Sequence, residues 1–136
     1  MIVFDKNITV KRPEDIAKIL QDILRTEDKI GQEKEHFYTI HLNHRNNIKL
    51  IELVTLGTLN ASLVHPRETF RRAVIEGTAQ IMIAHNHPSG SNEPSEEDKA
   101  ITQQLKKAGE ILGIELIDHI IFTQDNYLSL KEKNLL

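Results

Sequence analysis

The stretch from Ala79 to Gly90 reads Ala-Gln-Ile-Met-Ile-Ala-His-Asn-His-Pro-Ser-Gly, and it decides the fold. Its first six residues are apolar on both alternating faces, with Gln80 as the exception. A strand that is apolar on both faces is covered on both sides, as in the centre of an α/β sandwich. Pro88 and Gly90 then turn the chain. We therefore expect a buried central strand that ends in a polar loop, His85–Pro94.

Helices and further strands are predicted on either side of this strand. After the loop, apolar residues recur at spacings of four, three and four between Ile101 and Leu112, which is the pattern of one helix face. This helix begins at Ser95 and is stopped by Gly113. The same signals predict strands at Ile8–Val10, Glu35–Leu42, Ile48–Leu56, Ile114–Phe122 and Tyr127–Leu130, helices at Pro13–Arg25 and Pro66–Glu76, and a charged loop at Thr26–Lys34.

The resulting order of elements is βαββαβαββ. The chain shows no internal repeat and no linker rich in Pro, Gly or Ser that would divide it. Its 136 residues suit one ordinary domain with one hydrophobic core. We therefore predict a single domain, residues 1–136, of the α/β class: a three-layer α/β/α sandwich with a mixed sheet.

Composition excludes several classes of protein. No apolar run approaches the roughly 20 residues that cross a bilayer. The first residues lack the basic and apolar regions of a secretory signal, so we expect a cytoplasmic protein that uses no membrane. The absence of cysteine excludes disulfides, thiolate metal sites and cysteine nucleophiles. The chain has 17 basic and 20 acidic residues, for a net charge of −3, so it lacks the basic excess of nucleic-acid-binding proteins and direct contact with nucleic acid is not expected.

Two histidines and one aspartate have the spacing of a metal site. His85 and His87 stand two residues apart where the strand ends, and such residues point to the same side of an extended chain. Asp98 falls in the first turn of the next helix, where the helix dipole favours an ionised carboxylate. Open α/β sheets commonly bind ligands at the carboxyl ends of their strands. Two imidazoles and one carboxylate complete the protein ligands of a catalytic zinc, with a fourth position left for water.

A catalytic zinc also needs a proton carrier, commonly a carboxylate. Spacing alone does not choose among the candidates, which are Glu33, Glu35, Glu52, Glu68, Glu76 and Glu93. Glu35 begins an apolar strand, and it would reach the site if that strand lies next to the central strand. Glu33 would have the same facing if that strand began earlier.

The order His85-x-His87, seven residues, Ser95, two residues and Asp98 resembles the motif H-x-H-x7-S-x2-D of JAMM (JAB/MPN) metalloproteases, which also have a glutamate upstream. The flanking sequence is similar to the bacterial RadC family over roughly residues 13–136. The segments that carry this resemblance are His-Asn-His-Pro-Ser-Gly at 85–90, Pro94-Ser95, Gly57-Thr58-Leu59, His65-Pro66-Arg67-Glu68 and Asp118-His119-Ile120-Ile121. The glutamate of that family stands in a Glu-x-Phe setting, which is here Glu35-His36-Phe37.

The resemblance implies a sandwich like those of JAMM and cytidine-deaminase-like proteins. It also implies a zinc-dependent hydrolase whose partner is a protein or peptide with a peptide or isopeptide bond to cleave. It assigns the zinc to His85, His87 and Asp98, the general acid/base to Glu35, and the oxyanion-stabilising hydroxyl to Ser95. Many RadC proteins carry an N-terminal helix-hairpin-helix module that contacts DNA. We expect a standalone domain here, because 136 residues leave no room for that module.

Several of these residues also have a structural interpretation. Ser95 is a good N-cap, and the acidic residue three positions later resembles a capping box, so Asp98 can serve as cap and ligand together. His119 lies in an apolar strand and is interpreted as a buried, hydrogen-bonded histidine rather than a metal ligand. We expect substrate specificity to come from the loops Thr58–Val64 and Gly90–Pro94.

Three other functions compete with the hydrolase. A zinc deaminase on a similar architecture normally needs cysteine ligands, which this chain lacks. A DNA-repair-associated accessory is suggested by the family name, and DNA binding that falls steeply with salt would reveal it. A metal-stabilised binding module would hold the ion without catalysing hydrolysis. Glu35→Gln distinguishes the two, because a hydrolase would lose its activity and keep zinc, whereas a binding module would have no activity to lose.

Overall fold

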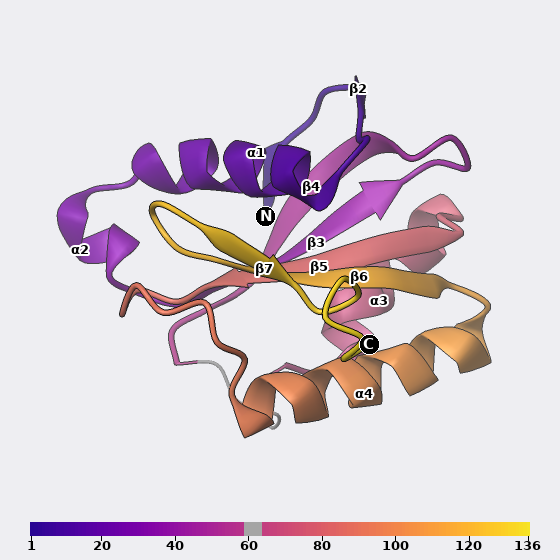
Figure 1. Ribbon diagram of the computed structural model, residues 1–136. Helices are drawn as coiled ribbons and strands as arrows, with labels where there is room; N and C mark the ends of the chain where they lie inside the picture. The colour runs from indigo at the N-terminus through magenta and orange to yellow at the C-terminus, as the bar shows by residue number, and fades with distance from the viewer. Residues whose placement is uncertain (59–63) are drawn as a thin grey trace.

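The computed structural model describes residues 1–58 and 64–136 and has three layers. Helix α1 (Pro13–Arg25) covers one face of a central sheet, and helices α3 (Pro66–Glu76) and α4 (Glu96–Leu112) cover the other (Figure 1). A short helix, α2 (Lys29–Gln32), follows α1. The α/β/α sandwich predicted from the sequence is confirmed.

Seven strands in the described residues form one sheet. They are β1 (Ile2–Phe4), β2 (Ile8–Thr9), β3 (His36–Leu42), β4 (Asn47–Leu56), β5 (Gln80–Asn86), β6 (Glu115–Phe122) and β7 (Tyr127–Ser129). Their order across the sheet is β1-β4-β3-β5-β6-β7, and β2 also pairs with β4. β5 and β6 run parallel while the other pairs are antiparallel, so the sheet is mixed. β5 lies between β3 and β6, in the central position that its apolar sequence predicts.

The two faces of β5 pack against different helices. Met82 and Ala84 belong to the core beneath α1, whereas Ile81 and Ile83 belong to the core beneath α3 and α4. Because side chains alternate along a strand, His85 continues the row of Ile81 and Ile83. The alternation that builds the core therefore also points the first histidine of the motif toward α4.

The observed elements follow the predicted ones, with three differences. The segment Thr26–Lys34, predicted as a loop, contains α2, because the Asp28 side chain accepts a hydrogen bond from the amide of Gly31 and caps this single turn. β1 has no sequence pattern of its own and is defined by its pairing with β4. β5 continues beyond its predicted end, so His85 and Asn86 still belong to the strand.

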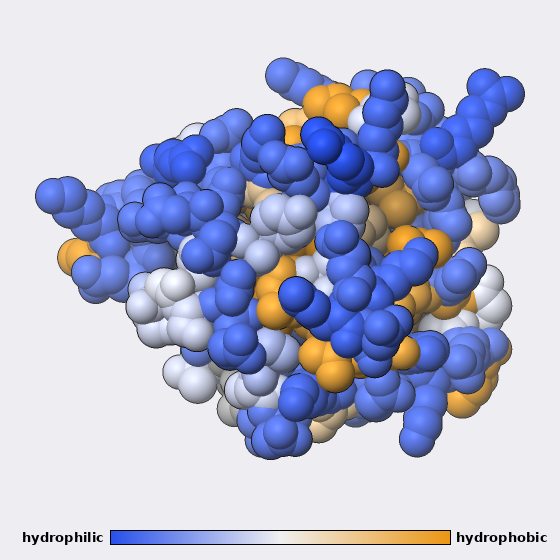
Figure 2. Space-filling view, viewed as in Figure 1, coloured by the Kyte–Doolittle hydropathy of each residue, from blue (hydrophilic) through white to orange (hydrophobic). Residues whose placement is uncertain are grey.

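The visible surface is mostly hydrophilic, with smaller hydrophobic patches (Figure 2). A paler area at the lower left lies over the loop between β5 and α4, where residues 88–95 are mainly Pro, Ser and Gly.

The longest helix in the described residues, α4, has 17 residues. None of the helices in residues 1–58 and 64–136 has the length and apolar character needed to cross a lipid bilayer.

His41 on β3 is fully buried, and neither of its ring nitrogens has a hydrogen-bond partner among the described residues. Burial lowers the pKa of His41 to about 4, although the charges of Glu52 and Glu76 oppose this shift. Arg72 and Lys49 act in the same direction as burial. The ring is therefore neutral in the folded protein at pH 7, whereas in the unfolded chain it titrates near its ordinary pKa of about 6.5.

We predict that the protein loses stability as the pH falls from about 6.5 to 4, because in this window the unfolded chain binds a proton at His41 and the folded chain does not. The stabilisation present above this window is about 3 kcal/mol, since one pKa unit corresponds to about 1.4 kcal/mol, and it is gone below the folded-state pKa. The free energy of unfolding can be measured with urea at pH 7 and at pH 4. Its decrease between these two pH values should be about 3 kcal/mol smaller for His41→Leu than for the wild type. Equal losses in the two proteins would contradict the prediction.

Candidate metal centre

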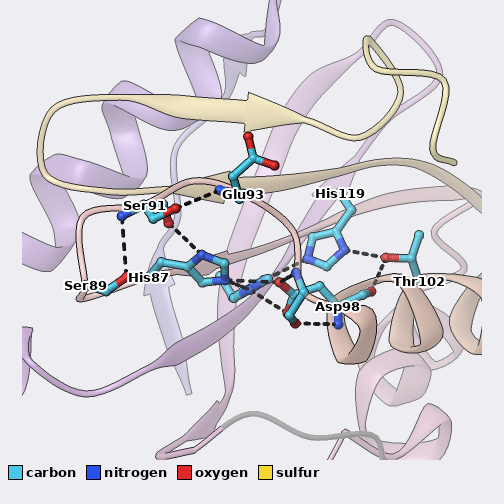
Figure 3. Close-up of polar contacts among 9 residues, drawn as sticks. His87, Ser89, Ser91, Glu93, Asp98, Thr102 and His119 are labelled. Carbon is cyan, nitrogen blue, oxygen red and sulfur yellow. Dashed lines mark hydrogen bonds and ion pairs between the residues drawn. The ribbon is translucent and has the colours of Figure 1, made fainter.

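The carboxyl end of β5 meets the first turn of α4, and the side chains of the predicted metal site converge there (Figure 3). His85 lies in β5 and is fully buried. His87 follows the strand, and its amide donates a 2.9 Å hydrogen bond to the carbonyl oxygen of Phe122, which keeps the chain in line with the sheet. Asp98 lies in the first turn of α4 and is buried. The structure therefore brings together all three predicted ligands.

The donor atoms of these side chains share one small space. The Nε2 atoms of His85 and His87 are 2.9 Å apart, and each lies 3.1 Å from a carboxylate oxygen of Asp98. When one donor atom is taken from each residue, the three atoms all lie within 4.8 Å of one another. Donors around one tetrahedral zinc are about 3.3 Å apart, because each bond is about 2.0–2.1 Å long. The spacing suits a single ion, so this group is able to hold a metal.

The second ring nitrogen of His87 is already used. Its Nδ1 lies 2.8 Å from the carbonyl oxygen of Ser91, and because a carbonyl only accepts, Nδ1 carries the proton. A neutral ring in this tautomer presents the lone pair of Nε2 to Asp98. A lone pair facing a carboxylate is satisfied by a cation or by a proton. Accordingly, the hydrogen bond with Asp98 raises the pKa of His87, against the opposing effect of burial.

Asp98 is also part of the helix cap that the sequence predicts. Its Oδ2 accepts a 2.8 Å hydrogen bond from the amide of Ser95, and the Oγ of Ser95 accepts a 3.0 Å bond from the amide of Asp98. Burial opposes ionisation of this carboxyl, but hydrogen bonds with His85, His87 and the Ser95 backbone outweigh it and hold the pKa well below its usual range. The capping box therefore keeps a charged carboxylate aimed at the two histidines.

Glu35 reaches the site from the neighbouring strand. It directly precedes β3, and the register of β3 and β5 pairs Phe37 with His85. If this register is continued two residues beyond its last pair, Glu35 comes opposite His87, and both residues line the same cleft. Its negative charge contributes to the raised pKa of His87. This pairing supplies a reason for choosing Glu35 that spacing along the chain does not.

Two of the three donor residues, His87 and Asp98, border an open cleft of about 900 Å³, and His85 lies buried behind them. Both predicted catalytic residues, Glu35 and Ser95, line it. Its other polar residues besides the two ligands are Glu33, Lys34, Thr58, Ser89, Ser91, Glu93 and Glu97. The bond that the Ser95 hydroxyl accepts uses an oxygen lone pair, so its proton can be donated to another group. Both predicted specificity loops contribute to the cleft: Gly90–Pro94 through Ser91 and Glu93, and Thr58–Val64 through Thr58. In Thr58–Val64, residues 59–63 lie outside the described residues.

His119 is joined to the site in a way that sequence reasoning missed. It is buried in β6, as predicted, and its Nε2 lies 2.8 Å from the Nδ1 of His85. Its Nδ1 lies 2.6 Å from the Oγ1 of Thr102 on α4 (Figure 3). Burial, assisted by the charge of His85, lowers the pKa of His119 well below its ordinary value. The signal that could have found it is the adjacency of two apolar strands that both carry histidine.

The sequence of this chain matches a protein-family model and is similar to several known proteins. The family model described as RadC-like JAB domain matches residues 10–135. A UPF0758 protein of Moorella thermoacetica is 45% identical over 127 residues, which cover 93% of this chain and 53% of the relative. The UPF0758 protein of Listeria innocua is 44% identical over 133 residues, or 98% of this chain and 57% of the relative. A UPF0758 protein of Methanosarcina mazei is 41% identical over 124 residues, or 91% and 52% respectively.

The chain thus spans about half the length of these relatives, and their names describe no reaction. The family match covers β5 and α4, which position the three predicted ligands, and β6, which carries His119. The resemblance seen in the motif from His85 to Asp98 and in its flanking segments is therefore confirmed. The chain belongs to the RadC-like JAB domain family.

Proposed function

We propose that this protein is a zinc-dependent hydrolase of the JAMM type that cleaves peptide or isopeptide bonds. The observation that carries the proposal is the convergence of His85, His87 and Asp98 at an open cleft. Glu35 and Ser95 line the same cleft. A buried metal group without access to substrate would be structural, whereas two residues of this group, His87 and Asp98, line an open cleft of about 900 Å³.

The donor set favours zinc among the common metals. Two imidazole nitrogens and one carboxylate oxygen are typical ligands of catalytic zinc, whereas magnesium and calcium prefer oxygen ligands alone. Three protein ligands leave one coordination position for water or substrate. When bound, zinc polarises the scissile carbonyl and makes water acidic enough to attack at neutral pH.

The residues around the donors have distinct roles in this proposal. Glu35 accepts the proton of the attacking water and returns it to the departing amine, as a general base and then a general acid. Ser95 donates its hydroxyl proton to the oxygen on which negative charge develops. The capping box orients Asp98, and the carbonyl of Ser91 orients the ring of His87.

The proposal is tested by measuring metal content and hydrolysis in the same preparation. Protein expressed with added zinc should contain about one zinc per chain, measured by elemental analysis after gel filtration. A library of internally quenched peptides and isopeptide-linked dimers should yield at least one substrate. Cleavage of this substrate should stop with a chelator and return with zinc.

Two outcomes would contradict the proposal. A wild type without zinc after supplemented expression would remove the metal site itself. Full zinc occupancy together with no cleavage across the library, for this domain and for a full-length relative, would favour a binding module instead. The relative is included because this chain spans about half of the length of such proteins.

A further inference from the structure

A chain of hydrogen bonds connects the two strands and the helix that surround the candidate metal centre. It runs from His85 on β5 to His119 on β6, then to Thr102 on α4, and returns to the backbone of Asp98. His119 and Thr102 are fully buried. The chain therefore begins at one proposed ligand and ends at another, although neither of its two middle residues belongs to the donor group.

The direction of these hydrogen bonds follows from the first donor. The hydroxyl of Thr102 lies 2.7 Å from the carbonyl oxygen of Asp98, which can only accept, so the single hydroxyl proton is committed there. The contact of 2.6 Å between Thr102 Oγ1 and His119 Nδ1 then requires the proton on Nδ1. A neutral His119 ring protonated at Nδ1 has a lone pair at Nε2. The 2.8 Å contact between that Nε2 and Nδ1 of His85 therefore requires a proton on His85 Nδ1.

A local irregularity of the sheet places His119 in this chain. The register pairs Ile81 with Leu116 and Ile83 with His119, so two steps along β5 correspond to three steps along β6. In a regular ladder Ile83 would pair with Asp118, and His119 would point to the opposite face. The extra residue is a bulge that turns the His119 ring to the side of α4.

We propose that His119 is a positioning residue that holds His85 in the Nδ1-protonated tautomer and so presents the His85 Nε2 lone pair to the metal. Thr102 sets the direction of the bond by committing its own proton to Asp98. A zinc-bound histidine commonly donates its other N–H to a carboxylate or carbonyl, and here a neutral imidazole is the acceptor. Because a neutral ring attracts this proton less than a carboxylate does, His85 stays a weaker base and leaves the ion more electrophilic. The inference rests on the metal site of the proposed function, though not on hydrolysis.

The tautomers can be measured in the wild-type protein without metal. Long-range proton–nitrogen NMR of the metal-free protein above pH 7.5 should show the Nδ1–H form for both His85 and His119. Assignment would come from single histidine substitutions. A His85 ring protonated at Nε2, or a His119 ring protonated at Nε2, would overturn the inference even if the protein binds zinc and is active.

Two substitutions at one position separate positioning from general structural loss. The amide of Gln reaches about as far as Nε2 of histidine, so His119→Gln keeps an acceptor for His85. The amide of Asn reaches only as far as Nδ1, so His119→Asn keeps a partner for Thr102 and leaves His85 without one. We expect His119→Asn to weaken zinc binding about 10- to 100-fold, and His119→Gln to stay within about 3-fold of the wild type. Competition with a chromophoric chelator measures both.

The matched control is His41→Asn, because His41 is another fully buried histidine of the same sheet that lies outside the donor group. This variant should retain wild-type zinc affinity and the tautomer of His85, whatever its unfolding free energy. Equal zinc affinities for His119→Asn, His119→Gln and the wild type would overturn the inference. A wild type that binds no zinc would instead overturn the proposed function, and the NMR tautomers would still decide the inference.

Discussion

Replacing Glu35 by Gln should lower kcat by about 10²- to 10⁴-fold and leave one zinc bound per chain, because the amide can form hydrogen bonds but cannot accept the proton of the attacking water. Glu35 lies outside the group formed by His85, His87 and Asp98, so zinc affinity should change by less than about 3-fold. The measurement is cleavage of the substrate found in the library, with zinc content determined in the same preparation.

Glu33→Gln is the matched control for this variant. Glu33 lines the same cleft and lies two residues earlier in the chain, so a general loss of negative charge would affect both variants alike. We expect Glu33→Gln to retain kcat within about 3-fold, because the continued register of β3 and β5 brings Glu35, and not Glu33, opposite His87. A large loss in Glu33→Gln with normal activity in Glu35→Gln would show that the roles are reversed.

Replacing Asp98 by Asn should weaken zinc binding by about 100- to 1,000-fold and remove activity with it. The reason is that a structural zinc contributes about 10–16 kcal/mol over four ligands, or about 2.5–4 kcal/mol for each ligand, and every 1.4 kcal/mol is tenfold in affinity. The Asn side-chain oxygen can still accept from the amide of Ser95, so the helix cap is kept. The loss therefore reports on the metal and not on the start of α4. Chelator competition and urea unfolding of the metal-free protein check the two parts.

The first helix provides the control for the cap. Asp15 occupies the same position in α1, where its Oδ2 accepts a 3.0 Å bond from the amide of Arg12. Asp15→Asn should change the unfolding free energy by less than about 1 kcal/mol and leave zinc affinity unchanged. If Asp98→Asn also kept wild-type zinc affinity, Asp98 would be a capping residue without a role as ligand.

Much of the fold could be predicted because it follows from local rules. The helices α1 and α3 begin at Pro13 and Pro66 as predicted, since proline suits the first helical turn and the apolar stripe follows directly. The strand β5 was predictable from its two apolar faces. By contrast, α2 depends on one side-chain cap at Asp28, and such a short turn leaves no periodic pattern to read.

The candidate site divides in the same way. His85 and His87 share a side because of strand geometry, and Ser95 and Asp98 form their cap because of helix geometry. These offsets are set by the backbone within a few residues, so the sequence by itself determined which groups converge from β5 and α4.

Only the tertiary structure decided which other residues join them. Glu35 reaches the cleft beside His87 because β3 pairs with β5. His119 meets His85 through the pairing of β5 with β6 and through the bulge in that ladder. Strand order, register and bulges arise from packing between segments far apart in the chain, and no local spacing records them.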